Sequence, residues 1–156
     1  MKLLEKRGCV TPEDSRTHIR IPFEMTQAGG EITIQFEYGP KVLEDMTRAL
    51  KLLEQSFDCY VLPAQREKAA KQANKYLPLK NLITLSLDDP NVYRGACHRH
   101  DAYQQLKLSE LRASPGLVIG KLPRGQWTAT LSFHCIVTGS CDYRLQIDWT
   151  DGEGER

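Results

Sequence analysis

The sequence lacks both a long apolar run and an excess of charge of one sign. No stretch approaches the roughly 18 uninterrupted apolar residues that a membrane-spanning helix needs. Lysine and arginine number 21 against 20 aspartate and glutamate residues, which gives a net charge of +1. Such a balance creates no overall electric field to attract nucleic acid or an anionic membrane. We therefore expect neither nucleic acid nor a membrane among the partners of this protein.

The sequence also lacks a cysteine framework and a secretory signal. Its five cysteines are odd in number and scattered, and no two of them have C-x-x-C spacing. This pattern fits reduced thiols in a cytoplasm better than disulfide bonds. The opening residues, MKLLEKR, are too short and too charged for a secretory signal. We expect a cytoplasmic protein.

Motifs that would identify an enzyme are missing as well. The sequence contains no Gly-rich phosphate loop after a strand, no nucleophile elbow and no paired-carboxylate motif in a fitting context. No internal repeat divides residues 1–156, and no composition shift marks a second domain. The sequence therefore predicts a single domain without catalytic residues, metal or cofactor.

Alternation of apolar and polar residues is the clearest positive signal. In residues 31–38, EITIQFEY, and residues 127–137, WTATLSFHCIV, apolar side chains fall on every second position. This period, between Gly and Pro turns, indicates half-buried antiparallel strands. The phase predicts that Trp127 and Cys135 belong to the core. Shorter alternating segments follow the same rule and are expected to be strands at residues 18–23, 79–87, 103–108 and 143–149.

One segment has a helical period instead. Between Lys41 and Phe57, apolar residues recur at steps of three and four, which predicts an amphipathic helix. Residues 64–75 are rich in helix formers and are expected to form a second, weaker helix. The apolar stripe that should pack on one end or edge of the sheets consists of Val42, Met46, Leu50, Leu53 and Phe57.

The predicted fold class is mainly β. We expect an antiparallel β-sandwich of the jelly-roll or galactose-binding-like type, with a helical insertion at about residues 41–75. Pro22 cannot donate to a strand ladder, so its strand is expected at a sheet edge or a bulge. Residues 1–17 are expected to be a loose lead-in and residues 150–156 a frayed tail.

A polar loop from Asp88 to Asp101, between two predicted strands, is the best candidate for a binding site. Loops at the ends of a sandwich carry most of its functional groups, because a rigid sheet positions them. The candidate ligand-binding residues, which gather in and just after this loop, are Arg94, His98, Arg99, His100, Asp101 and Tyr103.

Three kinds of ligand suit these side chains. An anionic ligand, or an acidic patch on a partner, would bind Arg94 and Arg99, and we favour it because it uses every charge present. A metal ion would use the two histidines and Asp101, but the neighbouring arginines repel a cation. An oligosaccharide would need an exposed aromatic ring, for which Tyr103 is the nearby candidate.

Five segments of turn and core residues form a recognisable pattern. They are LSLDDP at 85–90, YRG at 93–95, ASPG at 113–116, GKLPRGQW at 120–127 and YRLQI at 143–147. With these segments, the region of roughly residues 19–149 resembles the β-rich N-terminal accessory domain of bacterial CehA/McbA-type metallohydrolases. In that family the accessory domain precedes a PHP (polymerase and histidinol phosphatase) domain.

This chain departs from the family pattern in two places. The helical segment at 41–75 looks like an insertion where a short connection is expected. The chain ends at Arg156, about where the PHP domain would begin, and the Asp-x-His-x-His opening of that domain is missing. His98-Arg99-His100 reproduces only the His-x-His spacing, so no catalytic role is carried over to it.

Together these features predict a non-catalytic binding or interaction module. The resemblance implies an accessory domain that acts with a PHP-type metallohydrolase. The alternatives are a small metal-dependent hydrolase and a carbohydrate-binding module. A homodimer or a PHP-type hydrolase partner is expected, since exposed sheet edges favour pairing.

Overall fold

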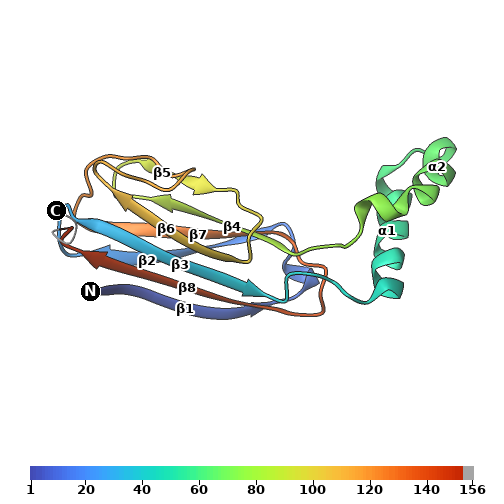
Figure 1. Cartoon of the computed structure of the whole chain (residues 1–156), viewed down its shortest axis with the longest axis horizontal. Coiled ribbons are helices and arrows are strands. Elements are labelled where there is room, and N and C mark those ends of the chain that lie inside the picture. The colour runs from blue at the N-terminus through green and yellow to red at the C-terminus, as the bar shows by residue number, and fades with distance from the viewer. Residues whose placement is uncertain (153–156) are drawn as a thin grey trace.

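Eight strands form two antiparallel four-stranded sheets in the computed structural model, which describes residues 1–152 (Figure 1). The β3 sheet has the strand order β1 (Lys2–Val10), β8 (Cys141–Thr150), β3 (Glu31–Gly39) and β6 (Tyr103–Ser109). The β7 sheet has the strand order β2 (Thr17–Met25), β7 (Gly125–Cys135), β4 (Leu82–Asp88) and β5 (Tyr93–Cys97). The predicted antiparallel β-sandwich with a helical insertion is confirmed.

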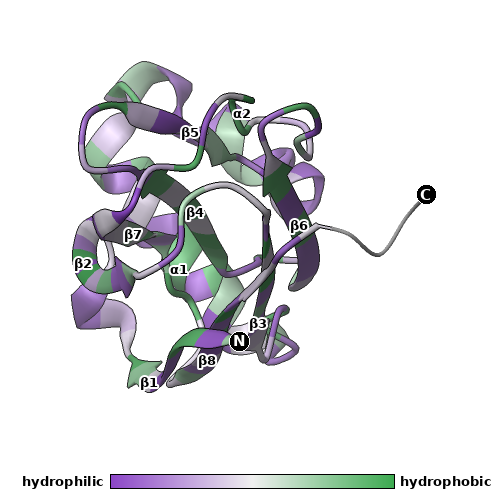
Figure 2. Ribbon diagram, turned by 90° about the vertical axis from the view of Figure 1, so that its left-hand side faces the viewer, coloured by the Kyte–Doolittle hydropathy of each residue, from purple (hydrophilic) through white to green (hydrophobic). Residues whose placement is uncertain are grey.

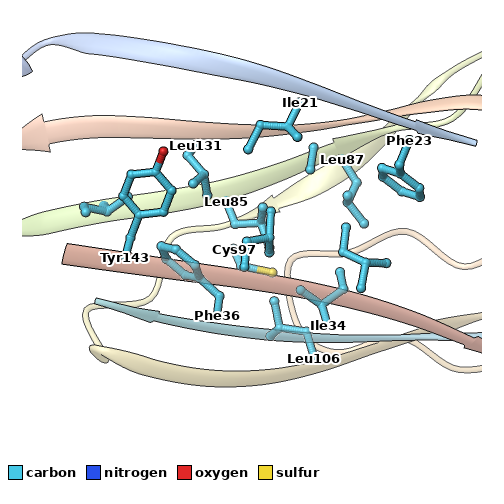
Figure 3. Packing of buried hydrophobic residues seen from close by; sticks show 14 of the residues in the cluster. Ile21, Phe23, Ile34, Phe36, Leu85, Leu87, Cys97, Leu106, Leu131 and Tyr143 are labelled. Atoms are coloured by element: carbon cyan, nitrogen blue, oxygen red, sulfur yellow. The ribbon is translucent and has the colours of Figure 1, made fainter. Parts of the chain in front are cut away.

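One hydrophobic core lies between the two sheets. Figure 3 shows Phe36 and Leu106 from the β3 sheet pointing toward Leu85 and Leu131 from the β7 sheet. All four side chains are fully buried, as is Trp127, whose core position the alternation predicted. Fully burying such a side chain is worth about 1.5–3 kcal/mol, so the inner faces determine the register of both sheets. Figure 2 shows the corresponding alternation of hydrophobic and hydrophilic residues along the strands.

The prediction of a loose lead-in at residues 1–17 is wrong. Residues Lys2–Val10 form β1, which pairs with β8 along its whole length, and Pro12–Asp14 form a short 3-10 helix. The strand escaped detection because it is an edge strand with a register shift between Lys2 and Leu4, and Val10 is its only fully buried side chain. At the other end Thr150 is the last residue of β8, and residues 153–156 of the predicted tail lie outside the described residues.

Two further local predictions need correction. The expected loop at residues 88–101 contains β5, whose residues pair with β4. Cys135 is exposed rather than buried. The register of β4 and β7 shifts between Leu82 and Ile83, so the side chains at the end of β7 no longer follow the alternation of the rest of the strand. The expectation for Pro22 is confirmed, since β2 is an edge strand of the β7 sheet.

The helical insertion projects from one end of the sandwich instead of packing on it (Figure 1). It contains α1 (Met46–Tyr60) and α2 (Arg66–Lys71), with 3-10 turns at Pro63–Gln65 and Ala73–Tyr76. We call residues 41–80 the arm. Asp45 begins α1 by accepting a hydrogen bond from the backbone N–H of Arg48 at 3.0 Å, as an N-cap does.

The arm has a small core of its own. Ala49 and Leu53 are buried, yet neither belongs to the hydrophobic core of the sandwich. Met46 and Leu50, which the sequence predicted to pack on the sheets, are 53% and 43% exposed. The helical period was therefore read correctly, but the helix packs against the rest of the arm.

Within residues 1–152 no helix has the length and apolar character that crossing a membrane requires.

Candidate functional site

Arg94 is a structural residue, which corrects its assignment as a ligand-binding residue. Its side chain is 3% exposed and all five of its N–H donors have partners. Nη1 donates to Asp89 Oδ2 at 3.0 Å and to the Lys121 carbonyl at 2.9 Å. Nε and Nη2 both donate to the Val118 carbonyl, and Nη2 also donates to that of Gly120 at 3.1 Å. A guanidinium with every donor occupied has none left for an external anion.

Two side chains from neighbouring segments, Asp89 and Trp127, contact this arginine. Asp89 is 4% exposed and accepts hydrogen bonds from the backbone N–H groups of Asn91 and Val92, both at 2.7 Å. Burial alone would raise the pKa of Asp89, but these two bonds and Arg94 outweigh it and hold that pKa below its ordinary value. The Arg94 guanidinium also lies 5.5 Å from the centre of the Trp127 ring. These residues fix the loops at the end of the sandwich opposite the arm.

Next to Arg94, the backbone at Gly95 lies very close to the backbone at Gly116. Gly95 and Gly116 have φ values of +105° and +98°, in the left-handed region that favours glycine. A Cβ on Gly95 would collide with the carbonyl oxygen of Gly116. Packing and backbone conformation therefore both require glycine at positions 95 and 116.

The other predicted site residues remain at the surface. His98, His100 and Asp101 are exposed and Arg99 is half-buried, all in the loop between β5 and β6. Tyr103, at the start of β6, is 58% exposed. Arg94 and Arg99 are separated by the length of β5, so the pair favoured for anion binding does not form. Within residues 1–152 no group of three His, Cys, Asp or Glu side chains is placed to hold a metal ion.

A buried asparagine holds the junction between the arm and the sandwich at residues 40 and 81, which we call the root of the arm. Asn81 is fully buried, and its Nδ2 donates to the Pro40 carbonyl at 2.8 Å and to Thr138 Oγ1 at 2.7 Å. Its Oδ1 accepts from the backbone N–H of Val137 at 2.7 Å. Lys41 Nζ donates to the Asn81 carbonyl at 2.6 Å, and burial lowers the pKa of this lysine. The arm therefore leaves the sandwich from a fixed base.

One side of the arm presents an apolar surface. Met46, Leu50 and Phe57 share a face of α1, because residues four and seven apart lie one above the other on a helix. Tyr76 continues this surface, with its ring 5.7 Å from that of Phe57, and is 54% exposed. We call these four residues the arm face. The sequence identified its three helical members but assigned them to the core, because periodicity does not reveal what a stripe packs against.

The outer side of the β3 sheet carries a second surface, made of polar side chains. One row across all four strands is Tyr103, Glu37, Arg144 and Arg7, and the next is Gln105, Gln35, Gln146 and Glu5. We call these eight residues the polar face. Its members are the out-of-phase positions of their strands. The sequence did not predict the face, because strand order decides which side chains share a row.

Hydrogen bonds and a hollow shape the polar face. Glu5 contacts Lys2 at 2.5 Å and Arg144 at 3.3 Å, and the pKa of Glu5 is lowered to about 2, chiefly by the bond from Lys2. Beside the first row lies an open hollow of about 790 Å³. Side chains that border it include Arg7, Glu37, Asp142 and Arg144.

No protein-family profile matches the chain, and no curated protein matches it.

Proposed function

We propose that this protein is a non-catalytic interaction module that holds a partner protein through the arm face. The observation that carries the proposal is an apolar helical surface on an arm whose root is tied to the sandwich by Asn81. Exposed Met and aromatic side chains are enriched at protein interfaces, where anchors of this kind fill pockets of the partner. A fixed root limits the freedom that the arm loses on binding.

Charge indicates what the partner surface contains. The arm has eight Lys and Arg against five Asp and Glu, a net charge of +3, and since the whole chain carries +1 the remainder carries −2. Lys68 and Lys75 form no ion pair within residues 1–152, whereas Lys71 pairs with Glu67 at 3.1 Å. We infer a partner whose apolar pocket is bordered by acidic side chains. Contact between the arms of two copies would bring like charges together, which disfavours an arm-to-arm homodimer.

A PHP-type metallohydrolase is the partner that we propose. The support is the resemblance of residues 19–149 to the accessory domain of such enzymes. The place of action that we propose is the cytoplasm, which agrees with five cysteines that are all free thiols.

The test measures binding of the purified chain to a purified PHP-type metallohydrolase from the same source by isothermal titration calorimetry. The double variant Met46→Ser/Leu50→Ser should weaken binding about a hundredfold, since a truncated anchor costs about 1–2 kcal/mol and 1.4 kcal/mol is tenfold. The matched control is Val92→Ser/Leu111→Ser, which removes two exposed apolar side chains, 59% and 84% exposed, from loops of the sandwich.

Three outcomes are decisive. Weaker binding of the arm variant beside unchanged binding of the control supports the proposal. Equal affinity for wild type and the arm variant would show that the arm face is not the contact. A hydrolase that does not bind the wild-type chain would remove it as the partner.

A further inference from the structure

We propose that the polar face of the β3 sheet binds a neutral oligosaccharide. This site is separate from the arm face, and the inference does not depend on the proposed partner. Its basis is the arrangement of planar polar side chains in two rows across four strands, with one exposed aromatic ring at the edge.

The two rows offer a surface of suitable size and chemistry. Neighbouring strands lie about 4.8 Å apart, so a row of four strands is about 14 Å long, the scale of a short oligosaccharide. The second row, with Gln105, Gln35 and Gln146, brings three side-chain amides together. An amide donates and accepts hydrogen bonds at once, as a sugar hydroxyl does. The face can therefore match several hydroxyl groups along an extended chain of sugars.

Hydrogen bonds hold part of the face in place before any ligand arrives. Arg144 Nη2 donates to Gln146 Oε1 at 2.6 Å, and Gln146 Nε2 donates to Asp148 Oδ2 at 2.6 Å. Glu5 Oε1 accepts from Arg144 at 3.3 Å. Side chains ordered in the free protein lose little freedom on binding, which favours affinity.

Tyr103 and the hollow provide the contacts that polar groups do not. Tyr103 opens the first row and is 58% exposed, so its ring is free to pack on the C–H face of a sugar. The hollow of about 790 Å³ borders Glu37, Arg144 and Arg7 of the same row. Its volume lies in the range of about 300–1,000 Å³ that small-molecule sites occupy. Gly39 lies on its border and adds no side chain to fill it.

The balance of charge favours a neutral ligand over an anion. The polar face contains two arginines, Arg7 and Arg144, against two carboxylates, Glu5 and Glu37. Glu5 contacts both arginines, at 3.4 Å and 3.3 Å, so their charge is largely compensated. A protein interface would also show an apolar centre, whereas the only aromatic residue of this face stands at its edge.

The experiment screens purified protein against short neutral oligosaccharides of gluco, xylo, manno and galacto configuration on a glycan array, with calorimetry on those that bind. Tyr103→Ala is the test variant. Tyr93→Ala is the matched control, because Tyr93 is also 58% exposed but belongs to β5 of the other sheet. Thermal unfolding of each variant shows whether the fold is intact.

The expected result is a neutral oligosaccharide that binds the wild-type chain and Tyr93→Ala alike, and binds Tyr103→Ala about tenfold or more weakly at an unchanged melting temperature. Gln35→Ala, in the middle of the second row, should weaken the same ligand. Failure of every neutral oligosaccharide to bind at millimolar concentration would overturn the inference. So would binding confined to sulfated sugars, or a loss of equal size in Tyr93→Ala.

Discussion

Arg94→Ala is the substitution that most directly tests the structural role of this residue. The change removes all five hydrogen bonds of the guanidinium at once. It leaves the Asp89 carboxylate, which is 4% exposed, with two backbone N–H partners and no cation. The Val118 carbonyl loses two donors, and the carbonyl groups of Gly120 and Lys121 lose one each.

The expected cost is about 3–5 kcal/mol of the free energy of unfolding. Removing one member of a buried ion pair costs that much, because the charge that remains is buried and uncompensated. Domains of this size are stable by about 5–15 kcal/mol, so the loss is a large part of the total. Arg94→Lys keeps the charge but offers three donors in place of five, so its cost should be smaller, at about 1–2 kcal/mol.

Urea-induced unfolding followed by tryptophan fluorescence measures these losses. The probe is apt because the Arg94 guanidinium lies 5.5 Å from the centre of the Trp127 ring. The control is Arg99→Ala, since Arg99 is half-buried in a loop and forms no ion pair within residues 1–152. Its cost should stay within about 0.5 kcal/mol. A loss below about 1 kcal/mol for Arg94→Ala, or an equal loss for Arg99→Ala, would refute the structural role of Arg94.

Asp89, the ion-pair partner of Arg94, should make the free energy of unfolding depend on pH in the acid range. The pKa of Asp89 is lower in the folded protein than its ordinary value, so its contribution to stability is present above the unfolded-state pKa of about 3.9. This contribution is lost as pH falls below about 4 and through the folded-state pKa. We expect the stability advantage of wild type over Asp89→Asn to shrink across that range. Urea unfolding in a pH series from about 7 to 3 measures it, and a constant advantage would contradict the assignment.

Three further predictions concern the arm and the turns. Leu53→Ala should lower the local stability of the arm by about 2 kcal/mol or more, because Leu53 is buried. Leu50→Ala should cost less than about 0.5 kcal/mol, because Leu50 is 43% exposed. Amide hydrogen exchange across α1 measures both losses. Asn81→Ala should cost about 3 kcal/mol in urea unfolding, since the Pro40 carbonyl and the N–H groups of Val137 and Thr138 lose this partner. A neutral result would contradict the role of the root. Gly95→Ala should cost more than about 2 kcal/mol, while Gly139→Ala, whose Cβ would meet no atom within 4 Å, should leave the melting temperature unchanged.

Periodicity located most of the strands and the helical insertion, because burial of one face leaves a regular trace along the chain. It failed at β1, where an edge strand buries only Val10 completely and so carries little alternation. It failed again at Cys135, where a register shift reverses the phase within a single strand. Both failures arise from pairing between distant strands, which a local pattern does not record.

The candidate site was harder to predict than the fold. The sequence placed Arg94 in a loop and assigned its charge to a ligand. Its partners include carbonyl groups 24 to 27 residues further along the chain, so its burial depends on how two loops meet. Tyr103 was identified as the one aromatic suited to a sugar, but its row partners on three other strands were not.

The sequence by itself determined the kind of each element, since the spacing of apolar residues, the prolines and the glycines act locally on the backbone. It also determined the inner faces of the sandwich, because a one-residue slip would expose every apolar side chain of a strand. Only the tertiary structure decided that the arm stands apart from the sheets, that Arg94 is buried and that eight polar side chains form one face. Each of these depends on contacts between segments far apart in the chain, and the same local pattern is compatible with burial or with exposure.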